Sequence, residues 1–435
     1  MPGNIDFLDL NRFRLAAAQV PSALLPRQVQ GTAQSTAVDI DIAEGNIVAV
    51  APSGESKSEL PLISLKGRQV WPCFVDIHTH LDKGHTWNRA PNPDGTFQGA
   101  IKAIAADRVH WTPDDMRRRM EFGLAASYAH GTRAIRTHLD SLGDFAAKSW
   151  PLYAELRREW SGRIELQAAC LVSIEYFRDK EAGGRLADLV AKHQGVLGAV
   201  VYVTADLDDL LDRIVQLATE RGLDLDFHTD ENGDPNSNAL LRIAKAVVRN
   251  KFKDKVLCGH ACSLAVQSAE NVEKTMNTVA EVGMGIVSLP MCNMYIQDRS
   301  FADDASPRTP HWRGVTLLHE LRSRGIPVAL ASDNVRDAFH PYGDHDLLEV
   351  FSFAAKVAHL DRPFGDWPAA VTRTPAHLMR LAGSGMIAPG NAADLIIFSS
   401  CDIDTMLCRG EPDRIVLRNG KRITAQLPDY ERGNI

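Results

Sequence analysis

Short apolar runs alternate with segments of helical periodicity from about residue 70 to about residue 380. This alternation is typical of repeated βα units, in which each strand is followed by a helix. We expect strands at residues 70–77, 132–138, 163–172, 197–203, 223–228, 255–260, 284–290 and 326–333. Eight such units in succession predict an α/β fold, a TIM-type (β/α)8 barrel.

The two ends of the chain have a different pattern. Residues 37–42 alternate apolar and polar side chains, a turn follows at 44–46, and residues 47–50 return, which indicates a β-hairpin. The tail has similar short runs at 393–398 and 414–423. We therefore expect residues 1–68 and 384–435 to form one small β-sandwich domain and residues 69–383 to form the barrel.

The composition excludes several classes of partner. With 435 residues, 45% of them hydrophobic, the chain can bury the core of a large globular domain. The net charge is −7 and the basic residues are scattered, so we expect no nucleic-acid partner. The start lacks a basic segment followed by an apolar one, and no run approaches about 20 apolar residues, so we expect a cytoplasmic protein with no membrane partner.

Ionisable residues stand where the expected barrel strands end. His78 and His80 are two apart at the end of the first run, so both imidazoles point to the same face and can reach one ion. Later strand ends carry a further set: His138 and Asp140, His228 and Glu231, His260, and Asp333. The carboxyl ends of barrel strands surround one mouth. A lone histidine is more often a core or surface residue, but this repetition predicts a site for zinc, iron(II) or another borderline divalent metal.

Six segments carry a resemblance to the metal-dependent amidohydrolase superfamily, and within it to the cytosine deaminase-like branch. They are HTHLDK at 78–83, RTHLD at 136–140, HTDE at 228–231, GH at 259–260, NMYIQDR at 293–299 and SDN at 332–334. His-x-His alone is a weak signal, whereas the ordered set is specific and spans nearly the whole chain. The resemblance implies a metal-dependent hydrolase that acts on C–N bonds other than peptide bonds.

The resemblance also implies roles for individual residues. The ligands of one divalent metal ion, zinc or iron(II), would be His78, His80, His228 and Asp333. An open position would hold a water whose pKa falls toward ~7. His260 and Asp333 would orient that water and take its proton, and Glu231 would shuttle protons to the substrate.

The end of the fourth expected strand bears on the number of metal ions. No lysine stands at residues 198–206. Superfamily members that hold two metals commonly carboxylate a lysine there, so the resemblance implies a mononuclear site. The same absence argues against a ring opener of the dihydroorotase or hydantoinase type.

The substrate side departs from the cytosine deaminase pattern. Ser173 replaces a glutamine near the end of the third strand, and Asn334 replaces an aspartate after the eighth. An amide both donates and accepts, whereas a carboxylate only accepts, so Asn334 changes what the pocket recognises. We expect substrate contacts from Ser173, Asn334, Lys83 and the aromatic wall Phe339. The Ser-Asp-Asn and His-Thr-His-x-Asp-Lys segments are also similar to the branch that hydrolyses N-alkylated ammelide.

These features give one leading hypothesis and three alternatives. The leading one is hydrolytic deamination of a small amino-substituted nitrogen heterocycle, such as a cytosine, another pyrimidine, a pterin or a triazine. The alternatives are N-dealkylation of an aminotriazine, hydrolysis of an amide or cyclic amide, and a barrel that binds without catalysis. The last would be marked by loss of a ligand residue, and none is lost. The family resemblance further implies a homo-oligomer.

Overall fold

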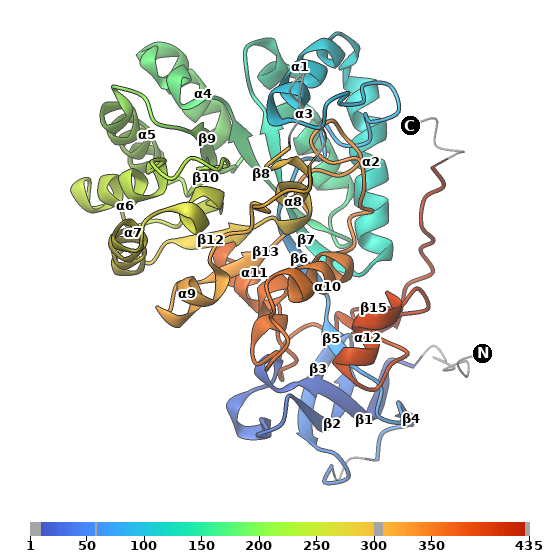
Figure 1. Ribbon diagram of the computed structural model, residues 1–435. Helices are drawn as coiled ribbons and strands as arrows, with labels where there is room; N and C mark the ends of the chain where they lie inside the picture. Colours follow the sequence, from blue (N-terminus) through green and yellow to red (C-terminus); the bar gives the residue numbers. More distant parts are fainter. Residues whose placement is uncertain (1–9, 57–58, 300–307, 431–435) are drawn as a thin grey trace. The chain divides into compact units, whose positions relative to one another are not determined.

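The computed structural model describes residues 10–56, 59–299 and 308–430 (Figure 1). The chain divides into two compact units. The first comprises Met1–Asp76, Ala125–Ala134 and Asp346–Pro428, and the second comprises Ile77–Leu124, Ile135–His345 and Asp429–Ile435. The domain boundaries expected after residues 68 and 383 stay a prediction, and residues 1–9 and 431–435 of the expected small domain lie outside the described residues.

The predicted barrel strands are present. Those in the described residues are β6 (Phe74–Thr79), β7 (Thr132–Asp140), β8 (Glu165–Leu171), β9 (Leu197–Val201), β10 (Leu225–Thr229), β11 (Val256–His260), β12 (Gly285–Ser288) and β13 (Val328–Leu330). Parallel ladders join β9 through β13 in chain order, and β6, β7 and β8 form a second sheet. Parallel bridges close the circle between Ser173 and Val200 and between Thr79 and Asp333. The fold class is therefore the (β/α)8 barrel that the periodicity predicts.

Helices follow the strands in the order that βα units require. They are α2 (Pro113–Ala129), α3 (Asp144–Glu159), α4 (Lys180–Lys192), α5 (Leu207–Arg221), α6 (Ala239–Arg249), α7 (Ala269–Glu281) and α9 (Leu318–Ser323). Figure 1 shows α4 to α7 on the outer side of β9 to β12. In α5 the buried residues recur every three or four positions, and Gly222 ends the helix at φ 63°. None of the helices in the described part of the chain combines the length and the hydropathy needed to cross a bilayer.

The first expected strand, 70–77, is two strands in the structure. Residues Val70–Pro72 form β5, which pairs with β14 (Leu395–Ile397) in a different sheet from β6. Pro72 has no N–H to continue a ladder. The backbone N–H of Cys73 donates to the oxygen of Asp394 at 2.9 Å, and that of Phe74 donates to Gly131 at 3.0 Å. The apolar run is continuous, so composition alone does not mark this change of sheet.

The first unit contains two four-stranded sheets, one built from the amino-terminal part of the chain and one in which three carboxyl-terminal strands join β5. The amino-terminal sheet has the order β3 (Asn46–Pro52), β2 (Ser35–Ala43), β1 (Arg12–Pro21) and β4 (Leu62–Ser64). The other has the order β16 (Lys421–Arg422), β15 (Ile415–Arg418), β14 and β5. The antiparallel pair of β2 and β3 confirms the predicted hairpin. The unit also contains α10 (Leu347–Val357), α11 (Arg373–Leu378) and α12 (Ile403–Arg409).

Candidate active site

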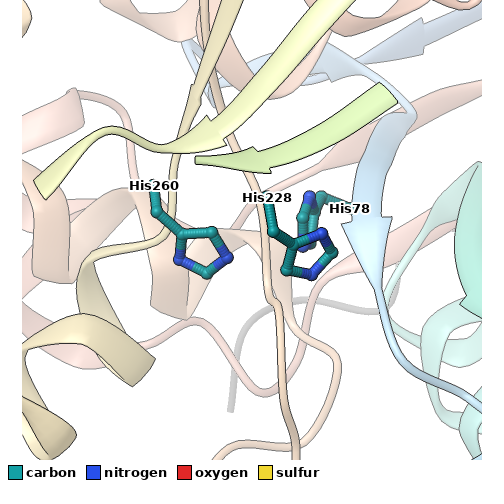
Figure 2. Close-up of side chains that lie close together, drawn as sticks. All are labelled: His78, His228 and His260. Atoms are coloured by element: carbon teal, nitrogen blue, oxygen red, sulfur yellow. The ribbon is translucent and has the colours of Figure 1, made fainter. Parts of the chain in front are cut away.

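Imidazole rings and a carboxylate from four strand ends converge at one point. His78 lies in β6 and His80 directly follows it, His228 lies in β10, His260 ends β11, and Asp333 follows β13. The Nε2 atom of His80 lies 3.2 Å from Nε2 of His228 and 3.2 Å from Oδ1 of Asp333. Figure 2 shows the rings of His78, His228 and His260 close together. The ring centroid of His228 is 4.5 Å from that of His78 and 5.0 Å from that of His260.

This donor set fits a divalent metal ion. Burial, reinforced by the neighbouring histidines and Lys83, lowers the pKa of His78, His80 and His228 well below its ordinary value. Burial also lowers the pKa of His260 to about 3. The rings are therefore neutral near pH 7, which is the form that binds metals. Among the described residues, ligand atoms lie within 4.8 Å of one another in three groups: His78, His228 and His260; His78, His80 and His138; and Glu231, His260 and Asp333. Nε2 of His260 has no hydrogen-bond partner within the described chain.

Local backbone geometry brings these side chains together. His260 and Asp333 have left-handed φ values of 69° and 61°, which are unfavourable for residues with a Cβ and concentrate at functional sites. Gly259 lets β11 approach the ring of His78, because a Cβ at this position would lie 2.9 Å from Cε1 of His78. The backbone N–H of Asp333 donates to the oxygen of His78 at 2.9 Å. The candidate metal ligands thus lie where the barrel closes.

Glu231 lies beside this cluster. Its Oε1 atom is 3.4 Å from Nδ1 of His260 and accepts a hydrogen bond from Nδ2 of Asn293 at 3.2 Å. Gln297 donates to the backbone oxygen of Glu231 at 3.1 Å. Burial, and then the charge of Asp333, raises the pKa of Glu231 well above its ordinary range. A carboxyl with a raised pKa can hold a proton near neutral pH and give it to a substrate.

Asp230 fixes the backbone next to Glu231. One of its carboxylate oxygens accepts from Oγ of Ser237 at 2.8 Å and from the backbone N–H of Ala239 at 3.0 Å. The other accepts from the backbone N–H of Leu240 at 3.0 Å. These N–H groups belong to the first turn of α6, where a helix leaves its donors unsatisfied. Asp230 therefore ties the start of α6 to the strand end that carries Glu231.

A cavity of about 830 Å³ opens beside the cluster, a size common for small-molecule sites. Its lining includes His80, His228, Glu231 and His260, and it includes all four residues expected to contact substrate: Ser173, Asn334, Phe339 and Lys83. Part of the wall is apolar, with Ile101 and Ile104 from α1 (Phe97–Asp107) and Leu142. The ring of Phe97 meets that of Phe339 edge to face, with centroids 5.5 Å apart.

Lys83 and Ser173 differ in how they are engaged. Lys83 is buried, with 7% of its surface exposed, and Nζ lies 5.8 Å from the ring centroid of Phe339. Within the described chain its ammonium has no hydrogen bond or ion pair. Ser173 is already bonded, since its Oγ lies 2.8 Å from the hydroxyl of Tyr202 and accepts from the backbone N–H of Glu175 at 3.2 Å. A ligand can therefore meet the charge of Lys83 more readily than the hydroxyl of Ser173.

Arg136 and Asp226, for which the sequence predicts no role, lie beside the cluster together with the strand-end residue His138. The ring of His138 lies 4.0 Å from that of His78, and its Nε2 is 3.3 Å from Oδ1 of Asp226. Arg136 Nη1 donates to Oδ2 of Asp226 at 3.0 Å. Asp226 and Arg136 each lie two residues before a strand-end histidine, so strand alternation turns them to the same face. The two-residue spacing is visible in the sequence, but it does not show that the side chains of Arg136 and Asp226 contact each other.

The chain is similar to one known protein family and to two individual relatives. Residues 173–423 match the amidohydrolase family. The chain is 44% identical over 421 residues to a pterin deaminase of Rhizobium rhizogenes (strain K84 / ATCC BAA-868). This alignment covers 96% of this chain and 95% of the relative. It is 24% identical to the N-isopropylammelide isopropyl amidohydrolase of Pseudomonas sp. (strain ADP), over 92% of this chain and 96% of that protein.

A solved structure shares the fold. The crystal structure of 5-methylcytosine deaminase from Klebsiella pneumoniae with 5-fluorocytosine superposes with a TM-score of 0.82 at 22% identity. The superposition covers 96% of this chain and 98% of that one. The family match covers more than half of the chain, and the 44% identity extends over nearly the whole of both chains. The chain belongs to the amidohydrolase family.

Proposed function

We propose that this protein is a metal-dependent hydrolase that removes an exocyclic amine from a nitrogen heterocycle and releases ammonia, and that its preferred ring is a pterin. The observation that carries the proposal is the contact of Glu231 with His260 and Asn293, next to the converging imidazoles and at the wall of a cavity. A proton-carrying carboxyl beside a metal centre is the arrangement that hydrolytic deamination requires. The 44% identity to a pterin deaminase supports the choice of ring.

The metal centre in this proposal holds one divalent ion, zinc or iron(II), bound by His78, His80, His228 and Asp333. Neutral imidazoles with one carboxylate suit either metal. When bound, such an ion lowers the pKa of a coordinated water toward ~7 and so supplies hydroxide at neutral pH. The end of β9 carries no lysine at residues 198–206, which supports a single ion.

Glu231 and His260 carry the proton transfers in the proposed reaction. His260, together with Asp333, orients the attacking water and takes its proton. Glu231 protonates the ring nitrogen next to the amine-bearing carbon as the water oxygen adds to that carbon. The resulting carboxylate takes up the remaining proton of the added hydroxyl group and delivers it to the amine, which leaves as ammonia. The proton taken from the water by His260 and Asp333 then returns to Glu231. Asn293 holds Oε1 of Glu231 at 3.2 Å and so restrains the carboxyl during both transfers.

Lys83 is proposed to bind an oxygen or an unprotonated nitrogen on the ring edge, and replacing it gives a testable result. We expect Lys83→Met to raise KM roughly 10-fold or more, because a charge-assisted hydrogen bond is lost from a desolvated site. The metal content should stay at the wild-type level. Lys102→Met, at an exposed position of α1, is the matched control. An unchanged KM in Lys83→Met would remove Lys83 from substrate binding.

A substrate panel tests the proposed function. Ammonia release would be measured with metal-loaded protein on pterins, cytosine and its 5-substituted forms, isocytosine and aminotriazines. We expect the highest kcat/KM on a pterin. Release of an alkylamine from an N-alkylated triazine would favour the second candidate, N-dealkylation, which the similarity to an N-isopropylammelide hydrolase and the SDN segment at 332–334 support. Ring opening without ammonia would favour cyclic-amide hydrolysis.

A further inference from the structure

One buried carboxylate fastens the loop that follows β13. The side chain of Asp337 is fully buried. Among the described residues, Asp337 does not line the cavity. Its Oδ2 accepts a hydrogen bond from Nδ2 of Asn334 at 2.6 Å. Its Oδ1 accepts from the backbone N–H groups of Phe339 at 2.9 Å and of His340 at 3.2 Å. Asp337 thus holds the two cavity residues Asn334 and Phe339 at once.

These contacts fix which way the amide of Asn334 faces. An asparagine amide has two N–H donors at one end and a carbonyl acceptor at the other, whereas a carboxylate only accepts. Asp337 therefore requires Nδ2 of Asn334 on its side. The Sγ atom of Cys292 lies 3.7 Å from Oδ1 of Asn334, a weak contact that is compatible with the same orientation. Nδ2 has a second hydrogen besides the one given to Asp337, and Asn334 lines the cavity, so we infer that this second hydrogen can reach a ligand there.

We propose that Asp337 is a positioning residue: it sets the hydrogen-bond polarity of Asn334, so that the cavity selects ring edges that present an acceptor to this amide. The inference rests on the proposed function, because it concerns how the same cavity recognises the hydrogen-bonding groups of its heterocyclic substrate. The wall residue Phe339 is tied to the same carboxylate, so donor and wall keep a fixed spacing.

The ionised form of Asp337 is the one that enforces this polarity. Burial raises the pKa of Asp337 to about 6, while the hydrogen bond from Asn334 and the charge of Lys83 act in the opposite direction. The carboxylate is therefore the main form at pH 7 and above. A protonated Asp337 has an O–H that can donate, and the amide orientation of Asn334 is then no longer enforced.

Asp337→Asn tests the proposal. The new amide keeps an oxygen for the backbone N–H groups of Phe339 and His340, but it turns a donor toward Nδ2 of Asn334. The amide of Asn334 is then expected to flip and to present its carbonyl to the ring. We expect KM for the best ring of the panel to rise roughly 10-fold or more, the scale of one mismatched buried hydrogen bond, with a smaller change in kcat and unchanged metal content.

A double-mutant cycle separates this role from a structural one. In an Asn334→Ala background, Asp337→Asn should change KM little further, because the residue through which Asp337 acts is gone. An equal rise in KM in both backgrounds would show that Asp337 acts through the loop as a whole, and the proposal would be wrong. An unchanged KM in the single variant Asp337→Asn would also overturn it.

A readout without turnover keeps this inference apart from the proposed function. In protein labelled with ¹⁵N-asparagine, the side-chain amide of Asn334 is identified by its loss in Asn334→Ala. We expect it to exchange with solvent slowly in the wild type and faster in Asp337→Asn, with the exposed Asn238 as the reference for fast exchange. Slow exchange in a protein that deaminates no ring would reject the proposed function and keep the positioning role. Fast exchange in the wild type would reject the positioning role.

Discussion

Glu231→Gln is expected to bind metal like the wild type and to lose roughly 10²-fold or more of kcat, the scale of general acid and base catalysis. The amide keeps an oxygen that can accept from Asn293, so the local geometry is preserved. It has no acidic proton to give to the ring nitrogen and cannot take one up for the leaving amine. The measurement is kcat and KM for the best ring, together with metal content by elemental analysis.

Two comparisons make the Glu231→Gln result specific. Glu181→Gln removes a carboxylate from the exposed surface of α4 and should leave kcat unchanged. KM in Glu231→Gln should change less than kcat, because the interaction is made mainly in the transition state. A Glu231→Gln protein with wild-type kcat would exclude Glu231 from the proton transfers.

His228→Asn is expected to abolish metal binding and to reduce deamination to the uncatalysed rate measured in buffer without enzyme. Nε2 of His228 lies 3.2 Å from Nε2 of His80, at the centre of the cluster. A divalent ion at this position would lose one of its nitrogen ligands, and without the ion no hydroxide is supplied at neutral pH. Metal content and ammonia release would be measured after the same metal-loading procedure for variant and wild type.

Thermal unfolding provides a second readout for the proposed role of His228 as a metal ligand. A ligand that binds only the folded state stabilises it, so a chelator should lower the Tm of the metal-loaded wild type. The same chelator should not change the Tm of His228→Asn. His110→Asn, at an exposed position, is the control and should behave like the wild type in both assays. Full metal occupancy in His228→Asn would mean that other residues hold the ion.

The sequence predicts the barrel and the candidate metal centre well because both depend on local patterns. Each strand is an apolar run, and each strand-end histidine or aspartate is placed by the register of its own strand. The break at Pro72 and Cys73 is harder to predict, because both strands are apolar and only their partners in space, such as Asp394 and Gly131, separate them.

The contacts around the candidate centre are less visible in the sequence. Arg136 and Asp226 are 90 residues apart, and nothing local to either shows that they pair beside His138. The role of Asp337 depends on the path of a loop, which brings its carboxylate to Asn334 and to two backbone N–H groups together. Such contacts follow from tertiary packing. A residue pattern shows which side chains share a face, but not which distant ones touch.

The most direct measurement is the mass of the product formed from a pterin in H₂¹⁸O by the metal-loaded protein, with ammonia measured in parallel. Hydrolytic deamination predicts one equivalent of ammonia per product and one ¹⁸O atom at the carbon that carried the amine. A product that retains the amine, whether because the ring has opened or because no reaction has occurred, would contradict the proposed function.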